Sequence, residues 1–502
     1  MQDLTERLNA VLALDPSANA IGTLDGQWFS YAALSNAIAA LDALLHAHGV
    51  GKGAAVAVLL RNRPAHFAVT LAVLVTRRCL VTVNPSLPDA PLAGDIATVR
   101  AGVIIASGPD WERDAVCDAA RDRNVLTLRI GEQDGAITID PLDAPATPLP
   151  VAARPDIAIE MLTSGTTGKP KRIELLYDSF ARSLWAGSQY EAGSANGLGL
   201  KRSVGIQWMP LVHIGGLFGA VYAFYNGRAF VLMERFNVDD WHGLILRHRP
   251  KFVNLPPSAL HMVLERNYPA EDFASLMALR SGAAPLDHDL ALEFERRYKV
   301  PVLESYGATE FAGGVAGWTI RDHRKFAATK RRSVGRANPG VELRVVDRAS
   351  FEPLGPDREG LLEVRSPQIG TTGDWVRTSD LARIDADGFL YILGRADNAI
   401  IRGGFKIMPD KVEDALRQLP DIREACVVGI PDDRLGQVPV AAVVAAPGRE
   451  IAEAAILGAL RDRLKPYEIP VRIRVLEAMP RTPSLKISHA GVRDLFQPSP
   501  VA

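Results

Sequence analysis

The sequence predicts an α/β protein with a large body of doubly wound, mostly parallel sheets, a small β-rich subdomain and a separate, mobile C-terminal α+β lid. Its 502 residues exceed what one hydrophobic core usually fills. Short β-rich runs alternate with helical patterns from residue 55 onward, which is typical of parallel sheets wrapped by helices. Over residues 335–392, Pro and Gly punctuate short alternating runs, and the strand–helix pattern resets after residue 395.

The first elements of the body alternate between strand and helix. Residues 55–60 predict a buried strand, residues 64–75 an apolar helix, and residues 79–83 a second strand closed by Asn84-Pro85. Further strands are expected at residues 103–106, 125–129, 157–162, 228–233, 251–255 and 302–305, and helices at residues 238–247, 258–266 and 287–298. Ligands of such sheets collect beyond the carboxyl ends of the strands, so we expect the site there.

The last third of the chain predicts the subdomain and the lid. Val341-Glu-Leu-Arg-Val-Val346 and Gly360-Leu-Leu-Glu-Val-Arg365 have the short alternating runs of antiparallel strands. The lid is expected to contain strands at residues 399–402, 425–430, 438–445 and 471–476, and helices at residues 409–419 and 451–464. These patterns predict a body over residues 1–394, a hinge at residues 395–397 and a lid over residues 398–502.

Composition limits the possible partners. Lys and Arg number 57 against 58 Asp and Glu, so the net charge of −1 gives no electrostatic footprint for nucleic acid or an anionic membrane. The three cysteines are too few and too scattered for a disulfide framework or a cysteine-based zinc site. No apolar run approaches the ~18 residues of a membrane span, and the N-terminus carries acids where a secretory signal has bases. We therefore expect a cytoplasmic protein.

The segment Leu162-Thr-Ser-Gly-Thr-Thr-Gly-Lys-Pro-Lys171 is the strongest local signal for a ligand. Its glycines let backbone N–H groups approach an anion, and its hydroxyls and lysines add donors suited to phosphate. It is not a Walker A loop, because the G-x-x-x-x-G-K-[ST] spacing is absent. Composition alone also fits a flexible Ser/Thr/Gly loop.

Six further motifs favour the phosphate-binding interpretation of this segment. They are Trp208-Met-Pro-Leu-Val-His-Ile-Gly-Gly216, Ser281-Gly-Ala-Ala-Pro285, Tyr306-Gly-Ala-Thr-Glu310, Thr378-Ser-Asp380, Gly394-Arg-Ala-Asp397 with Gly403-Gly404, and Pro480-Arg-Thr-Pro-Ser-Leu-Lys-Ile487. Together with the loop, and in this order, they resemble the signature motifs of the adenylate-forming enzymes, which include acyl-CoA synthetases, luciferase and peptide-synthetase adenylation domains. The resemblance spans nearly the whole chain and is greatest to fatty- or aryl-acid–CoA ligases.

The resemblance implies an ATP site. Tyr306 offers a face on which adenine stacks, Asp380 accepts from the ribose hydroxyls, and Arg395 bridges to ribose or phosphate. Thr309 supplies a hydroxyl for the α-phosphate, and Glu310 is the carboxylate suited to Mg²⁺. Taken alone, Glu310 also fits an acid at a helix N-terminus, and Asp380 a turn residue. The remaining ATP-binding positions are Thr163, Ser164, Gly165, Thr166, Thr167, Gly168, Lys171, Gly282, Ala283, Ala284 and Gly307, with Lys169 expected to converge on the same polyphosphate.

Lys486 is the expected catalytic lysine. Activating a carboxylate with ATP brings two anions together and develops charge on the phosphates, so a fixed ammonium group stabilises the transition state. The resemblance makes Asp397 the hinge residue, which absorbs a large φ/ψ change as the lid turns. Taken alone, Lys486 also fits a solvated surface lysine, and Asp397 a turn acid.

The resemblance also places the acid and CoA. His213 with Gly215 and Gly216 looks like the wall of the acyl tunnel, where His213 acts as a gate; a lone His is also often structural. Gly403, Gly404 and Phe405 let the pantetheine arm pass close to the backbone, unless they form only a turn. The rest of the acyl pocket is expected from Ala308, Gly313 and Gly314.

Four positions depart from the family pattern. Arg172, Ser379 and Leu485 each replace a glycine with a bulkier residue near the nucleotide, and Lys411 changes the start of the first lid helix. None of these changes removes a functional group, so we expect an active enzyme.

The predicted function is that of an AMP-forming acid–thiol ligase. ATP and a carboxylic acid give acyl-AMP and pyrophosphate, and CoA then displaces AMP; Mg²⁺ accompanies ATP. Small residues near Gly313 and Gly314 favour fatty, aromatic or alicyclic acids over acetate. A free-standing enzyme that loads a carrier protein and a catalytically silent nucleotide-binding regulator remain as alternatives. The acid and the oligomeric state, monomer or homodimer, stay open.

Overall fold

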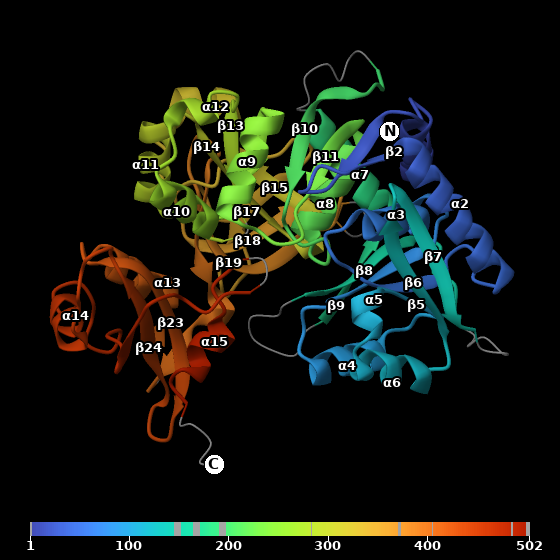
Figure 1. Cartoon of the computed structure of the whole chain (residues 1–502). Coiled ribbons are helices and arrows are strands. Elements are labelled where there is room, and N and C mark those ends of the chain that lie inside the picture. Colours follow the sequence, from blue (N-terminus) through green and yellow to red (C-terminus); the bar gives the residue numbers. More distant parts are fainter. Residues whose placement is uncertain are drawn as a thin grey trace.

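The computed structural model describes residues 3–144, 152–163, 171–189, 197–282, 284–369, 373–403, 405–482 and 485–497. Its elements form five sheets (Figure 1). The largest has the order β7-β6-β5-β3-β4-β8-β9, in which the five central strands run parallel and the two edge strands antiparallel. Its strands are β3 (Ala55–Leu59), β4 (Cys79–Val83), β5 (Val103–Ser107), β6 (Leu126–Gln133), β7 (Ala136–Asp143), β8 (Ile157–Thr163) and β9 (Lys171–Leu176).

Helices cover both faces of this sheet, as expected for a doubly wound fold. Val56 and Val58 of β3 pack into the core that holds α3, whereas Ala55, Ala57 and Leu59 pack into the core that holds α4 and α6. Because side chains alternate along a strand, both faces of β3 must be apolar, which explains its unbroken apolar run. The helices are α2 (Tyr31–Ala47) and α3 (Pro64–Val75) on one side, and α4 (Asp89–Thr98), α5 (Gly108–Trp111) and α6 (Asp114–Asp122) in the crossovers that follow.

Two further mixed sheets, each with parallel and antiparallel pairs, complete the α/β part of the body. One has the order β10-β11-β1-β2 and the other β12-β13-β14-β15-β16. The first contains β1 (Asn19–Gly22), β2 (Trp28–Ser30), β10 (Lys201–Gln207) and β11 (Arg228–Leu232), with helices α1 (Leu4–Leu12), α7 (Tyr177–Ser188) and α8 (Ile214–Tyr225). The second contains β12 (Phe252–Asn254), β13 (Ala278–Ser281), β14 (Val302–Ala308), β15 (Gly313–Gly317) and β16 (Arg336–Ala337), with helices α9 (Val238–His248), α10 (Pro257–Arg266), α11 (His288–Tyr298) and α12 (Ile320–Phe326) and 3₁₀ turns at Ala270–Phe273 and Thr309–Phe311.

The β-rich subdomain is a four-stranded antiparallel sheet. Its order is β17-β18-β19-β20, from β17 (Glu342–Val346), β18 (Gly360–Arg365), β19 (Val376–Ile384) and β20 (Leu390–Arg395). Buried Glu363 in β18 receives hydrogen bonds from Arg344 (2.8 Å) and Arg377 (2.9 Å) on the strands at either side. This antiparallel sheet confirms the change of pattern seen in the sequence.

The C-terminal elements have cores of their own and form a lobe, coloured orange to red, at the lower left of Figure 1. They are β21 (Ile400–Arg402), β22 (Phe405–Ile407), α13 (Pro409–Arg417), β23 (Ile422–Asp432), β24 (Gly436–Ala445), α14 (Glu453–Leu460), β25 (Ile473–Leu476) and α15 (His489–Asp494). The helix expected at residues 451–464 is shorter: it spans Glu453–Leu460, and turns follow at residues 461–463. In the described part of the chain, no helix has the length and apolarity that a membrane span requires.

Candidate active site

The structure brings together the residues expected at adenine and ribose. Tyr306 lies in β14, and its hydroxyl donates a hydrogen bond to Asp380 Oδ2 in β19. Asp380 faces Arg395 directly across the β19–β20 pair, and Arg395 Nη2 donates to Ser379 Oγ. The aromatic face, the carboxylate and the guanidinium thus converge from three strands.

Close backbone contact shapes the turn that carries Thr309 and Glu310. A Cβ on Gly307 would overlap the carbonyl oxygen of Gly313 and lie 2.8 Å from Gly314 Cα, so only glycine lets β14 and β15 approach this closely. Residues Thr309–Phe311 then form a single 3₁₀ turn, on which the Glu310 side chain is exposed. An exposed carboxylate at this turn is free to take part in coordinating a cation.

The adenine-side turn lies next to the same strand. A Cβ on Gly282 would lie 2.9 Å from Ser305 Oγ, one residue before Tyr306. Ala284 follows in the same turn, whereas Ala283 lies outside the described residues. The predicted neighbours of the base therefore meet at the ends of β13 and β14.

Most of the predicted phosphate loop lies outside the described residues: Ser164, Gly165, Thr166, Thr167, Gly168 and Lys169, together with the side chain of Thr163. Its two flanking strands are described. Thr163 ends β8 and pairs in register with Lys171, the first residue of β9. The loop is thus the connection of an antiparallel pair at the sheet's edge, and β9 is an element that the sequence patterns did not reveal.

Arg172, a departure from the family pattern, points into the sheet. Its guanidinium lies 2.6 Å from Asp95 Oδ1 and 3.6 Å from Glu160 Oε1, and it donates to Thr82 O at 3.2 Å. These three contacts hold the guanidinium group against β4 and α4. The substitution is accommodated by an ion pair between partly buried Arg172 and buried Asp95.

The expected acyl residues gather at the start of α8 and along β15. His213 is the N-cap residue of α8. A Cβ on Gly216 would overlap the carbonyl oxygens of Met209 and Pro210, and one on Gly215 would crowd the Met209 side chain. Across from α8, a Cβ on Gly313 would lie 2.9 Å from Ser183 Oγ and 3.4 Å from the Phe218 ring.

His213 is also close enough to Lys486 to feel its charge. Burial first, and the positive charge of Lys486 second, lower the pKa of His213 to about 4. The imidazole is therefore neutral at pH 7, so it does not repel the ammonium group of Lys486. The structure thus brings close together the predicted gate, His213, and the predicted catalytic lysine, Lys486, which lie 273 positions apart in the sequence.

The Lys486 segment is docked on α10 of the body. Ser258 Oγ donates to Leu485 O at 3.0 Å, and the Leu485 side chain packs against the apolar core around Trp241 and Phe273. Nearby, Arg423 of β23 forms an ion pair with Glu265 of α10. The Lys486 side chain keeps solvent-accessible surface, but the surrounding protein lowers the pKa of its ammonium group.

Leu485 adopts a left-handed conformation, with φ of 62°. This is the conformation that glycine adopts most easily, and a leucine there costs about 1–2 kcal/mol. Partial burial of its side chain against the body offsets part of that cost. The bulkier residue thus adds an apolar anchor to the docked state.

The predicted hinge and CoA positions lie at the start of the C-terminal elements. Residues Ala396–Asn398 form a 3₁₀ turn after β20; the side chain of Asp397 lies outside the described residues, as does Gly404. Gly403 (φ 54°) occupies the turn between β21 and β22. Phe405 is exposed and stacks on Tyr467, with ring centroids 4.6 Å apart.

Asn62 holds the segment that precedes His213 and was not among the predicted site residues. It is buried; its Nδ2 donates to Trp208 O (3.0 Å), Met209 O (3.0 Å) and Met233 O (3.1 Å), and its Oδ1 accepts from Leu211 N–H (2.8 Å). A lone Asn after a strand gives no sequence signal for partners some 150 residues away.

Replacing Asn62 by Ala should loosen that segment. We expect a loss of about 1–3 kcal/mol in the free energy of unfolding, because buried backbone groups lose their partners. The KM for the acid should rise while the KM for ATP changes little, since the segment borders the predicted acyl pocket. Denaturant titration and steady-state kinetics test both effects, with exposed Asn19→Ala as the control; an equal rise in both KM values would contradict this role.

Glu304 predicts a pH effect on stability. It lies in β14, two residues before Tyr306, and desolvation by burial raises the pKa of its carboxyl from 4.5 to about 8. The folded state then holds a proton that the unfolded state releases, so stability falls as the pH rises from about 4.5 to 8. In Glu304→Gln, the Tm advantage over the wild type should grow across this range, and a constant difference would refute the assignment.

Known protein families and proteins match this chain over most of its length. The profile of the AMP-binding enzyme family matches residues 10–372, and that of the AMP-binding enzyme C-terminal domain matches residues 411–486. The chain is 29% identical to an indoleacetate–CoA ligase of Aromatoleum aromaticum (98% of each chain covered), to a 2-succinylbenzoate–CoA ligase of Geobacillus kaustophilus (93% of each) and to a 4-coumarate–CoA ligase-like protein of Oryza sativa (94% of this chain, 88% of the relative).

Solved structures of similar proteins share the fold of this chain over nearly its whole length. An amide bond synthetase from Marinactinospora thermotolerans superposes with a TM-score of 0.80 at 26% identity, covering 99% of this chain and 100% of that one. An o-succinylbenzoate CoA synthetase from Bacillus subtilis, in complex with ATP and magnesium, gives 0.77 at 25% identity, covering 97% and 98%.

The chain belongs to the AMP-binding enzyme family, and thus to the adenylate-forming superfamily that its motifs resemble. The prediction of an enzyme of the AMP-forming acid–thiol ligase class is confirmed.

Proposed function

We propose that this enzyme joins an aromatic or other bulky apolar carboxylic acid to coenzyme A through an acyl-adenylate. The observation that carries this proposal is the docked Lys486 segment, which sets an ammonium group beside His213. The relatives named above are ligases of aryl acids, and this favours the aromatic members of the predicted substrate range.

The first step uses the docked arrangement. A carboxylate oxygen attacks the α-phosphorus of ATP, the bond from that phosphorus to the bridging oxygen breaks, and pyrophosphate leaves with its electrons. Asp380 and Arg395 hold the ribose, Tyr306 the adenine and Glu310 the Mg²⁺ ion, while Lys486 stabilises the charge that builds on the phosphates. Lys171 and the loop before it bind the polyphosphate.

The second step requires the lid to turn about Asp397. The turn withdraws Lys486 and brings Gly403, Gly404 and Phe405 to the tunnel mouth. The CoA sulfur, after losing its proton to solvent, attacks the acyl carbon, and AMP departs as the C–O bond breaks. Residues 1–394 act as the body and residues 398–502 as the lid.

A panel of acids tests the function. Wild-type enzyme with Mg·ATP, CoA and aromatic, alicyclic or fatty acids is assayed for AMP release and for thioester by mass spectrometry. We expect the highest kcat/KM with an aromatic acid and one AMP per thioester. An amine and a phosphopantetheinyl carrier protein replace CoA in parallel arms; faster turnover with either acceptor would overturn the assignment of CoA.

A further inference from the structure

A carboxylate, a thiol and an imidazole meet beside β23, apart from every site residue assigned above. They belong to Glu413 of α13, Cys426 of β23 and His489, the first residue of α15. The atoms that these side chains can offer to a metal all lie within 4.8 Å of one another. In Figure 1 the three elements lie together in the C-terminal lobe, where α13 and α15 both contact β23. Oxygen, sulfur and nitrogen ligands thus converge from three elements.

The position of β23 at the edge of its sheet explains why polar side chains gather there. Among the described strands β23 pairs only with β24, so its outer backbone groups need other partners. Glu413 Oε1 accepts from Val427 N–H at 2.8 Å, and Arg493 Nε of α15 donates to Gly429 O at 3.2 Å. The two helices that flank this edge therefore bring their polar side chains to the place where the Cys426 side chain begins.

Glu413 is held as ligating carboxylates are held. Its Oε2 accepts from Arg417 Nη2 at 2.7 Å, while its Oε1 accepts from the backbone. Each carboxylate oxygen has two lone pairs, so each keeps one for a metal ion. Hydrogen bonds of this kind fix the orientation of a ligating group and support its binding. Arg417 also pairs with Asp414 at 2.8 Å, so its charge is shared between two carboxylates.

The thiol and the imidazole are available to a metal. Cys426 is buried and not in a disulfide, and neither its Sγ nor the His489 ring has a hydrogen-bond partner in the described part of the chain. Zinc bonds of about 2.0–2.3 Å place tetrahedral ligand atoms about 3.3–3.8 Å apart, so the cluster must tighten by up to about 1 Å. His489 is exposed, and its side chain can make this movement and admit an ion from solvent.

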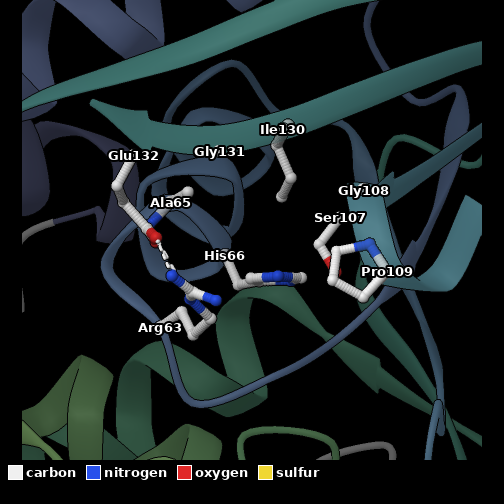
Figure 2. Close-up of a pocket in the computed structure, with 9 residues that line it drawn as sticks. All are labelled: Arg63, Ala65, His66, Ser107, Gly108, Pro109, Ile130, Gly131 and Glu132. Atoms are coloured by element: carbon white, nitrogen blue, oxygen red, sulfur yellow. Dashed lines mark hydrogen bonds and ion pairs between the residues drawn. The ribbon is translucent and has the colours of Figure 1, made fainter.

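A second carboxylate shows what the thiol adds. In the small cavity beyond β3 and β5, shown in Figure 2, Glu132 Oε2 accepts from Arg63 Nη2 at 2.7 Å and Oε1 from Ala65 N–H at 2.9 Å. Glu132 therefore has the same kinds of partner as Glu413, one arginine and one backbone N–H. No cysteine is among the described residues that line that cavity. The soft Cys426 ligand distinguishes the cluster at β23.

We propose that Glu413, Cys426 and His489 bind one Zn²⁺ ion, with a water molecule in the fourth position. A set of one oxygen, one sulfur and one nitrogen suits Zn²⁺, whereas Mg²⁺ takes oxygen ligands in an octahedron. When the ion binds, the Cys426 thiol passes its proton to solvent and the thiolate bonds to the metal. Only one cysteine takes part, so cysteine spacing could not indicate this site. The proposal does not depend on the proposed function.

Co²⁺ is the spectroscopic probe of this site, and Zn²⁺ is its competitor. The reduced, metal-free full-length protein is titrated with Co²⁺ without ATP. One equivalent should bind and produce a thiolate-to-cobalt charge-transfer band, which Zn²⁺ removes by displacing Co²⁺. An excess of Mg²⁺ should leave the band unchanged. Bound Zn²⁺ should also raise the Tm, because the ion joins α13, β23 and α15.

Substitutions assign the ligands. Cys426→Ser should abolish the charge-transfer band, and His489→Ala should weaken Zn²⁺ at least about tenfold. The controls are Cys117→Ser, a half-buried thiol elsewhere, and His46→Ala, an exposed imidazole; both should bind as the wild type does.

Two results would overturn the proposal. One is the absence of saturable Co²⁺ or Zn²⁺ binding to the wild type, and the other is wild-type Zn²⁺ affinity in a folded Cys426→Ser or in His489→Ala. Should Cys426→Ser not fold, His489→Ala decides the question, because its side chain is exposed and its loss leaves the core intact. Weakened Zn²⁺ binding by that variant, with a charge-transfer band in Cys117→Ser, supports the site; unchanged binding refutes it.

Discussion

Lys486→Ala should lower the rate of acyl-adenylate formation by about 10²–10³-fold, the effect of removing one preorganised donor from a charged transition state. The affinity for ATP should change little, because the proposed nucleoside-binding residues Tyr306, Asp380 and Arg395 are unchanged. The ammonium group is already placed for this step, since the segment is docked on α10 through Ser258 and its charge reaches His213.

The two half-reactions separate this role from a general loss of structure. Acid-dependent ATP–pyrophosphate exchange measures adenylation, and a chemically made acyl-adenylate supplied with CoA measures the second step alone. The variant should fail in the first assay and stay within about threefold of the wild type in the second. Arg461→Ala, an exposed position of the same lobe, is the control and should be normal in both. Exchange that survives in Lys486→Ala would refute the role.

Gly307→Ala should cost both stability and activity. Because the added methyl group would overlap Gly313 O, β14 and β15 must move apart, at about 1–3 kcal/mol for an overpacked site. The same shift displaces Tyr306 and Glu310 on either side, and a misplacement of about 1 Å can reduce the rate 10²-fold. We therefore expect the rate with ATP and acid to fall about 10²-fold even at temperatures at which the variant stays folded.

Gly243→Ala is the matched control. This residue lies in α9, and nothing lies within 4 Å of an added Cβ. There the same substitution should stabilise the helix, by up to about 1 kcal/mol, without affecting the rate. Thermal unfolding and initial rates test both variants; an active, fully stable Gly307→Ala would show that the close approach of β14 and β15 is not required.

The sequence predicted the elements well where burial acts on both faces of a strand. β3, α3 and β4 were expected almost residue for residue, because their apolar runs have one interpretation. β9 was missed, because an edge strand with mixed polar and apolar residues carries no comparable signal. The helix expected at residues 451–464 was too long, since apolar content alone does not mark where a helix stops.

In the candidate site, too, the sequence predicted some features and missed others. The motifs named Tyr306 and Asp380, but only the structure shows that the two side chains share a hydrogen bond. Asn62 could not be found from the sequence, because its role depends on hydrogen-bond partners that distant segments supply. The role of Leu485 as an anchor also needed its backbone angle and its neighbours in the body.

One measurement tests the central claim most directly: acid-dependent exchange of labelled pyrophosphate into ATP without CoA, followed by addition of CoA to the same mixture. The account predicts exchange that requires both Mg²⁺ and the acid, and then AMP and thioester in equal amounts. Formation of ADP, or thioester without prior exchange, would contradict the acyl-adenylate route.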